Sequence, residues 1–195
     1  MIVIVDYGAG NLQSVKNALD KLGIPSLITD DQAAILNATH VIFPGQGHFG
    51  ACIYALREKG LFEVIQEAAL TKHFFGICVG MQLLFEKSEE APGVLGLGIL
   101  KGEVRKFPEN YKLPQMGWKK IQSLDPNSNE QFFYFAHSYY CLPEDPLIVT
   151  GATMDTEPFA CIVEKGNLFS VQFHPEKSSS QGLVLFEKFA GRQKC

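Results

Sequence analysis

The sequence predicts an α/β fold in which a largely parallel central sheet carries helices on both faces and antiparallel strands at its edge. The first half of the chain alternates short apolar runs with helical patterns, which is typical of a parallel sheet. From about Gly98 onward, strand-like runs follow one another across short turns, which favours antiparallel pairing at the sheet edge or in a small second sheet. The 195 residues, 46% of them hydrophobic, are enough for a single domain over residues 1–195.

Strands and helices alternate through the first half. The expected strands are Met1–Val5, Ser26–Thr29, His40–Phe43 and Phe74–Cys78. Apolar residues at helical spacing mark a first helix at Leu12, Val15, Ala18, Leu19 and Leu22, and a second at Leu61, Val64, Ile65, Ala68 and Ala69. Gly23 and Pro25 stop the first of these helices, and a third helix begins near Gly80.

The second half is rich in strands. They are expected at Ile99–Phe107, Trp118–Ile121, Phe132–Tyr139, Leu147–Ala152, Ala160–Glu164 and Leu168–Phe173. Leu183, Phe186 and Phe189 then mark a closing helix. Open α/β sheets bind ligands beyond the carboxyl ends of their strands, so we expect the chemistry in the loops after Val5, Phe43, Cys78 and Phe173.

Composition excludes several classes of function. The net charge of −4 argues against broad binding of a nucleic-acid backbone. We expect no membrane association, because no apolar run reaches the ~20 residues of a bilayer span and no signal-peptide pattern is present. The five cysteines are Cys52, Cys78, Cys141, Cys161 and Cys195. Their wide spacing fits neither a disulfide framework nor a zinc site, which indicates a reducing compartment, the cytoplasm.

The segment Gly76-Ile77-Cys78-Val79-Gly80 lies between a strand and a helical pattern. It has the form of a nucleophile elbow with cysteine in place of serine, in which small flanking residues permit a sharp turn that exposes the central side chain. A helix N-terminus there would favour the reactive thiolate. The alternative is a buried cysteine between two glycines that allow helix packing.

A thiol nucleophile needs a base, and the base needs an orienting acceptor. His174 directly follows the run Leu168–Phe173, at a strand end that would face the same crevice as Cys78. Glu176, two residues further on, is placed to accept a hydrogen bond from the imidazole. The alternative is a surface loop with a solvated histidine.

The loop Pro44-Gly45-Gln46-Gly47 also ends a strand. Its two glycines let backbone N–H groups turn toward a developing oxyanion. The alternative is that the loop is simply a turn between a strand and a helix, which would have the same sequence pattern. Among the other histidines, His48 follows this loop and remains a site candidate, while His137 fits either a core strand or an interface. No cluster of residues has the spacing of metal ligands.

The Cys78 elbow and the downstream His174-Pro175-Glu176 resemble the class I glutamine amidotransferases. The start Asp6–Leu12, the aromatic run Tyr134–Tyr139 and the extended His174–Ser178 are similar to the glutaminase subunits of imidazole glycerol phosphate synthase, as is Met116-Gly117-Trp118. The resemblance covers nearly the whole chain. It implies a flavodoxin-like three-layer class I glutamine amidotransferase fold.

The resemblance also implies roles for individual residues. Cys78 would be the nucleophile that forms a γ-glutamyl thioester, His174 the general acid and base, and Glu176 its orienting group. The residues implied for the oxyanion and the substrate glutamine are Gly45, Gln46, Gly47, Val79, Gln82, Glu90, Ser138 and Tyr139. Those implied at the partner interface are Asn11, Trp118, Tyr134 and Lys177. The partner would be a barrel-shaped cyclase subunit in a heterodimer, and no metal or organic cofactor is implied.

Two positions depart from the family pattern. Gln46 stands where the family usually has valine in the oxyanion segment, and Lys119 stands where it usually has asparagine. Both positions are linked in the family to activation and partner contact. The main alternative is therefore a paralogous subunit that feeds ammonia to another synthase, such as a sugar amidotransferase. Another class I glutaminase and an inactive interaction subunit are the remaining alternatives, and the intact Cys78, His174 and Glu176 argue against the latter.

Overall fold

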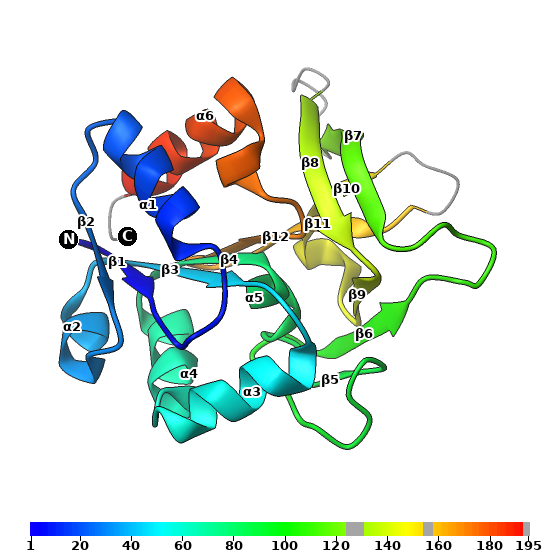
Figure 1. Ribbon diagram of the computed structural model, residues 1–195, viewed down its shortest axis with the longest axis horizontal. Helices are drawn as coiled ribbons and strands as arrows, with labels where there is room; N and C mark the ends of the chain where they lie inside the picture. The colour runs from blue at the N-terminus through cyan, green and yellow to red at the C-terminus, as the bar shows by residue number, and fades with distance from the viewer. Residues whose placement is uncertain (124–130, 154–157, 193–195) are drawn as a thin grey trace.

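A mixed sheet runs through the computed structural model, which describes residues 1–123, 131–153 and 158–192 (Figure 1). The strands are β1 (Ile2–Val5), β2 (Ser26–Thr29), β3 (His40–Gly45), β4 (His73–Cys78), β5 (Lys87–Ser88), β6 (Gly102–Lys106), β7 (Gln115–Ser123), β8 (Gln131–His137), β9 (Tyr139–Pro143), β10 (Val149–Thr153), β11 (Ala160–Lys165) and β12 (Leu168–Val171). The helices are α1 (Leu12–Lys21), α2 (Gln32–Asn37), α3 (Phe49–Glu58), α4 (Phe62–Thr71), α5 (Val79–Gln82) and α6 (Ser179–Ala190), with 3₁₀ turns η1 (Pro146–Ile148) and η2 (Pro175–Lys177).

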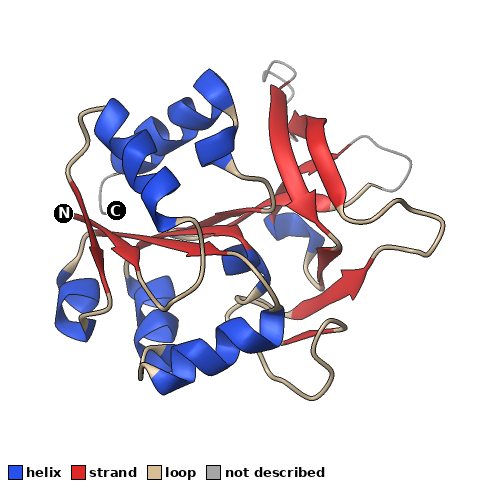
Figure 2. Cartoon of the chain, in the orientation of Figure 1, coloured by secondary structure: helices blue, strands red, loops and turns tan. Residues whose placement is uncertain are grey.

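The parallel part of the sheet has the order β2-β1-β3-β4-β12. Helices α1 and α6 cover one face, and α3 and α4 cover the other (Figures 1 and 2). Every residue of β1, β3, β4 and β12 is buried, because both faces of these strands are covered. The three-layer α/β prediction is confirmed.

Antiparallel strands extend the same sheet beyond β12, in the order β11-β10-β7-β8. A branch formed by β9 and β6 joins it where Ala160 of β11 pairs with Cys141 of β9. The predicted antiparallel edge is therefore continuous with the parallel core, and the described strands do not form a separate second sheet.

Three local predictions were wrong. The aromatic run predicted as one strand, Phe132–Tyr139, is two strands that part at Ser138, because β8 pairs with β7 while β9 pairs with β6. The predicted strand Leu147–Ala152 begins as a 3₁₀ turn, which Asp145 caps through its side chain and the Leu147 N–H. The predicted strand Ile99–Phe107 begins only at Gly102, because the N–H groups of Ile99 and Leu100 donate to the Leu84 carbonyl instead. The helix predicted near Gly80 is present as the four-residue α5.

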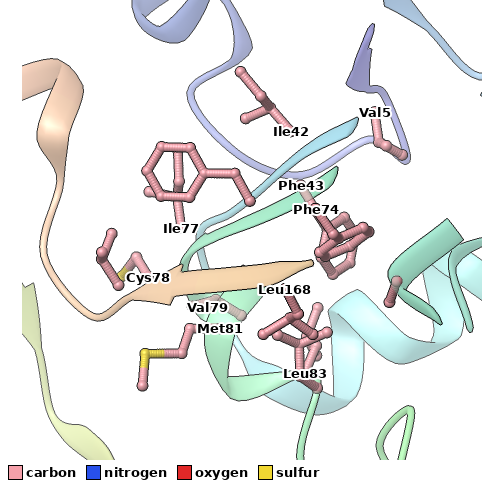
Figure 3. Close-up of a cluster of buried hydrophobic side chains, with 14 of the residues drawn as sticks. Val5, Ile42, Phe43, Phe74, Ile77, Cys78, Val79, Met81, Leu83 and Leu168 are labelled. Atoms are coloured by element: carbon pink, nitrogen blue, oxygen red, sulfur yellow. The ribbon is translucent and has the colours of Figure 1, made fainter. Parts of the chain in front are cut away.

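Buried apolar side chains from neighbouring strands pack beneath the end of β4 (Figure 3). Phe43 and Phe74 contact each other, with ring centroids 5.8 Å apart. Cys78, Val79 and Met81 lie at the border of this cluster (Figure 3). The Cys78 backbone is thus held on a close-packed base. Among the described residues, no helix is long and apolar enough to cross a membrane.

Candidate active site

Cys78 lies at the carboxyl end of β4 in a backbone conformation that residues with a Cβ rarely adopt, with φ 54° and ψ −112°. The glycines around it explain how the turn is built. A Cβ on Gly80 would lie 2.0 Å from the Phe43 carbonyl oxygen, and a Cβ on Gly45 would lie 2.3 Å from the Gly80 nitrogen. Only glycines let β3 and the turn approach this closely, so packing holds Cys78 in a strained geometry of the kind found at functional sites.

His174 and Glu176 form a buried pair on the loop after β12. The His174 Nδ1 lies 2.8 Å from the Glu176 Oε1, and the two side chains are 5% and 2% exposed. The His174 backbone N–H donates to the Tyr134 carbonyl at 2.9 Å, which ties this loop to β8. Since β12 lies beside β4 in parallel, the loop reaches the same sheet edge as Cys78.

The electrostatics of the site favour a positively charged His174. Burial opposes the charge, but the charge of the Cys78 thiolate and a hydrogen bond with its side chain outweigh that penalty. The Glu176 carboxylate adds to them, and together these groups raise the pKa of His174 to about 10. The arrangement therefore favours the imidazolium form of His174 beside the Cys78 sulfur.

A cavity of about 200 Å³ opens above Cys78. Its lining residues are Gln46, Gly47, Cys78, Val79, Gln82, Glu90, Pro114, Ala136, His137, Ser138, Tyr139, His174 and Lys177. The structure thus brings together ten of the residues whose roles the resemblance implied. Two others support the cavity from behind: Gly45 packs on the elbow, and Glu176 pairs with His174.

Gln82 and Glu90 lie on the cavity wall with defined partners. The Gln82 Nε2 donates to the Tyr139 carbonyl at 3.0 Å and to the Gln172 Oε1 at 3.1 Å. Both amide hydrogens are thereby used, which leaves the Gln82 Oε1 as an acceptor for a ligand. The Glu90 Oε2 accepts from the Phe49 N–H at 2.7 Å, which fixes its carboxylate at the start of α3.

The loop after β3 presents Gln46 and Gly47 to the cavity, and both residues are exposed. Gly47 has φ 102°, a conformation that favours glycine. His48, the next residue, accepts from the Gly50 N–H through Nδ1 and caps α3. The structure therefore gives His48 a structural role and leaves the oxyanion role of the loop as a prediction.

The residues expected at a partner interface lie on different elements. Trp118 of β7 is 53% exposed and packs edge-on against Tyr134, its register partner in β8. Lys177 is exposed at the cavity wall. Asn11 caps α1, with its Oδ1 accepting from the Ser14 N–H at 3.4 Å. The interface role of these residues stays a prediction.

Three residues of the site were missed by sequence reasoning or left undecided. The Gln172 Nε2 lies 3.8 Å from the Cys78 Sγ. The Ser178 Oγ donates to the His174 carbonyl at 2.6 Å and accepts from the Tyr134 N–H, so it fixes the His174 loop. His137 lines the cavity, and burial lowers its pKa to about 4, which makes it neutral at pH 7. Gln172 and Ser178 both flank the His174 loop, and that proximity was the available signal.

Comparison with known proteins agrees with this geometry. Residues 3–191 match the family model of the class I glutamine amidotransferases. The chain is 46% identical to the imidazole glycerol phosphate synthase subunit HisH of Moorella thermoacetica, over 96% of this chain and 93% of that protein. It is 40% identical to the subunit HisH 1 of Methanococcus maripaludis, over 97% and 98%.

Two solved structures show the same fold at low sequence identity. A glutamine amidotransferase crystal structure matches with a TM-score of 0.80 and 20% identity, over 98% of this chain and all of that one. PurLQS from Thermotoga maritima matches with a TM-score of 0.68 and 21% identity, over 95% and 98%. The chain therefore belongs to the class I glutamine amidotransferases and, within them, to the HisH subunits of imidazole glycerol phosphate synthase.

Proposed function

We propose that this chain is a glutaminase subunit that hydrolyses glutamine to glutamate and ammonia through Cys78, His174 and Glu176. The observation that carries the proposal is the strained Cys78 elbow on the same small cavity as the buried His174–Glu176 pair. We further propose that the ammonia passes to a cyclase subunit in a cytoplasmic heterodimer. That subunit makes imidazole glycerol phosphate and AICAR for histidine biosynthesis.

The first half of the reaction forms a thioester. The Cys78 thiolate attacks the carbon of the glutamine side-chain carboxamide, and the electron pair of the C=O bond moves onto oxygen. Backbone N–H groups of Val79 and of the segment 45–47 stabilise this oxyanion, at about 3 kcal/mol for each donor. When the C–N bond breaks, the His174 imidazolium donates its proton to the departing nitrogen, which leaves as ammonia.

The second half reverses the role of His174. The neutral imidazole takes a proton from water as the water oxygen attacks the thioester carbon. Collapse of that intermediate breaks the C–S bond, returns the thiolate and releases glutamate. Glu176 accepts from the His174 Nδ1 throughout, so the other ring nitrogen remains directed at the reacting atoms.

This division of roles predicts unequal losses at the two positions. Glu176→Gln is expected to lower kcat for glutamine hydrolysis by about 10²- to 10⁴-fold, and His174→Ala to lower it further. The amide keeps a hydrogen-bonding group beside Nδ1, whereas alanine removes the proton carrier. Steady-state glutamate release at matched folding, checked by circular dichroism, measures both losses. Equal and complete loss in the two variants would show that Glu176 does more than orient His174.

The ammonia product explains why a partner is needed. Ammonia that reaches bulk water is protonated and is no longer a nucleophile, so the cavity must open into a second protein. Trp118 and Met116, 53% and 63% exposed, lie on the β7 strand near the cavity residue Ala136 of β8. This exposed apolar surface is the area that we propose the cyclase covers.

An assay under three conditions tests the proposed glutaminase activity and its activation by the cyclase. Glutamate release is measured on the chain alone, with the cyclase, and with the cyclase plus its nucleotide substrate. We expect the chain alone to be slow and the third condition to be at least about tenfold faster. The peptide between Gly45 and Gly47 can change orientation at small cost, and about 1.4 kcal/mol of bias changes the active population tenfold.

The outcomes of this assay separate the alternatives. Equal rates in all three conditions would show that the cyclase and its substrate do not activate the glutaminase. If those equal rates are measurable, they also favour the paralogous subunit that serves another synthase, the alternative raised by Gln46 and Lys119. No glutamate release in any condition would contradict the proposed function itself.

A further inference from the structure

We propose that Gln172 is a further catalytic residue, whose side-chain amide donates a hydrogen bond to the Cys78 sulfur and stabilises the thiolate. This inference rests on the proposed function of Cys78 as the nucleophile. It adds Gln172 to Cys78, His174 and Glu176 as a residue that contacts the reacting sulfur.

The sheet register places Gln172 beside Cys78. Strands β4 and β12 are parallel, and Val171 pairs with Ile77. The next residues along the chain are therefore Gln172, just past the end of β12, and Cys78, the last residue of β4. The Gln172 backbone N–H donates to the Cys161 carbonyl of β11 at 3.0 Å, which holds the residue in line with the sheet.

The direction of the Gln172 amide is set by its neighbour. Its Oε1 accepts from the Gln82 Nε2 at 3.1 Å, so its Nε2 is turned the other way and lies 3.8 Å from the Cys78 Sγ. Gln82 is itself held by the Tyr139 carbonyl at 3.0 Å. The chain of contacts Tyr139–Gln82–Gln172–Cys78 therefore presents N–H hydrogens, and not a carbonyl oxygen, to the sulfur.

The burial of the sulfur gives this contact its importance. Cys78 is 3% exposed and Gln172 is fully buried, so little water reaches a thiolate there. A buried charge needs hydrogen-bond donors, and bonds to charged groups are the strong ones. His174 is one donor, but it also moves a proton during the reaction. Gln172 does not titrate and remains a donor at each stage in which the thiolate is free.

Other ionisable groups lie around the sulfur and are common to every variant compared below. They are Tyr7, Cys52, Cys141 and His174, which interact electrostatically with Cys78, Glu176 behind His174, and Glu90, His137 and Lys177 on the cavity wall. Their shared contribution cancels when the pH dependence of two variants is compared.

The test is the pH dependence of Cys78 alkylation by iodoacetamide in the full chain without glutamine, with the labelled peptide identified by mass spectrometry. Gln172→Met keeps the side-chain length and removes the donor. Its alkylation midpoint is expected to rise by about one pH unit, a tenfold loss of thiolate below the midpoint. The kcat for glutamine hydrolysis is expected to fall by a similar factor.

Two further variants control for folding. Gln82→Met leaves Gln172 in place but removes the group that fixes its amide, so a smaller rise in the midpoint is expected. Gln66→Met removes a comparable side-chain bond, from its Nε2 to the Leu97 carbonyl at 2.7 Å, away from Cys78. The Gln66 variant is expected to keep the wild-type midpoint.

The possible failures are distinguishable. If Cys78 is alkylated ahead of the other cysteines but the midpoint is unchanged in both Gln172→Met and Gln82→Met, the role of Gln172 is wrong and the proposed function stands. If Gln172→Met does not fold, the Gln82→Met midpoint decides. If another cysteine of the wild-type chain reacts first, the proposed nucleophile is wrong.

Discussion

Cys78→Ala is expected to abolish glutamine-dependent turnover of the complex, by a factor on the order of 10⁶, while turnover with added ammonium salt remains. Loss of a triad nucleophile has an effect of this size because the remaining groups then act without a covalent step. The alanine leaves the elbow backbone and its packing in place. The synthase site lies on another chain in the proposed heterodimer, so an external supply of ammonia bypasses the lost thiol. Both rates are measured on the same complex.

Cys161→Ala is the matched control. Cys161 is also buried in a sheet strand, near the start of β11, and burial raises the pKa of its thiol, so it is not a reactive thiolate. We expect this variant to keep glutaminase activity within a few-fold of wild type. Retained glutaminase activity in Cys78→Ala would contradict the assignment of Cys78 as the nucleophile. So would an alkylating glutamine analogue that labels another cysteine before Cys78.

Gly80→Ala is expected to destabilise the protein by about 3 kcal/mol and to remove most glutaminase activity. The new Cβ would lie 2.0 Å from the Phe43 carbonyl oxygen, and that neighbour is backbone that does not rotate away. Strand β3 and the elbow must separate, which displaces both Cys78 and the following N–H of Val79. Urea denaturation measures the loss of stability, and glutamate release measures the loss of activity.

Gly191→Ala provides the comparison for this substitution. Gly191 follows α6 with φ −80°, and a Cβ there would lie 3.5 Å from its nearest neighbour, an ordinary contact. Its effect on the free energy of unfolding is expected to stay within about 0.5 kcal/mol. A Gly80→Ala protein as stable and active as Gly191→Ala would show that the close approach of β3 to the elbow is not needed.

The strands of the parallel core were predictable because each is a short apolar run bounded by turn residues. Strand β2 matches its predicted bounds Ser26–Thr29. Helix α3 was missed because its N-cap is His48, not one of the common capping residues, and its sequence includes a glycine and two aromatic residues. Helix α2 spans only six residues, which is too few to show a helical repeat of apolar residues, although Asp31 does cap it.

The residues of the site also differ in how far the sequence predicts their positions. Cys78 and His174 were predictable because they lie at or just beyond the ends of two apolar runs, and parallel strands end at a common edge. Gln172 was not, because its relation to Cys78 depends on the pairing of β12 with β4, which no local pattern specifies. The separation of β8 from β9 at Ser138 likewise depends on which distant strand each one pairs with.

The central place of β12 in the sheet also bears on the order in which the molecule is assembled. Strand β12 joins β4 to β11, although ninety residues separate Leu168 from Cys78 along the chain. During synthesis, β4 therefore waits with one edge open until nearly the whole polypeptide has emerged, and contacts of such long range slow folding. An open, largely apolar edge is prone to pair with other chains. The nascent protein is thus most exposed to aggregation before it acquires any capacity for catalysis, since the same late strand brings His174 to Cys78.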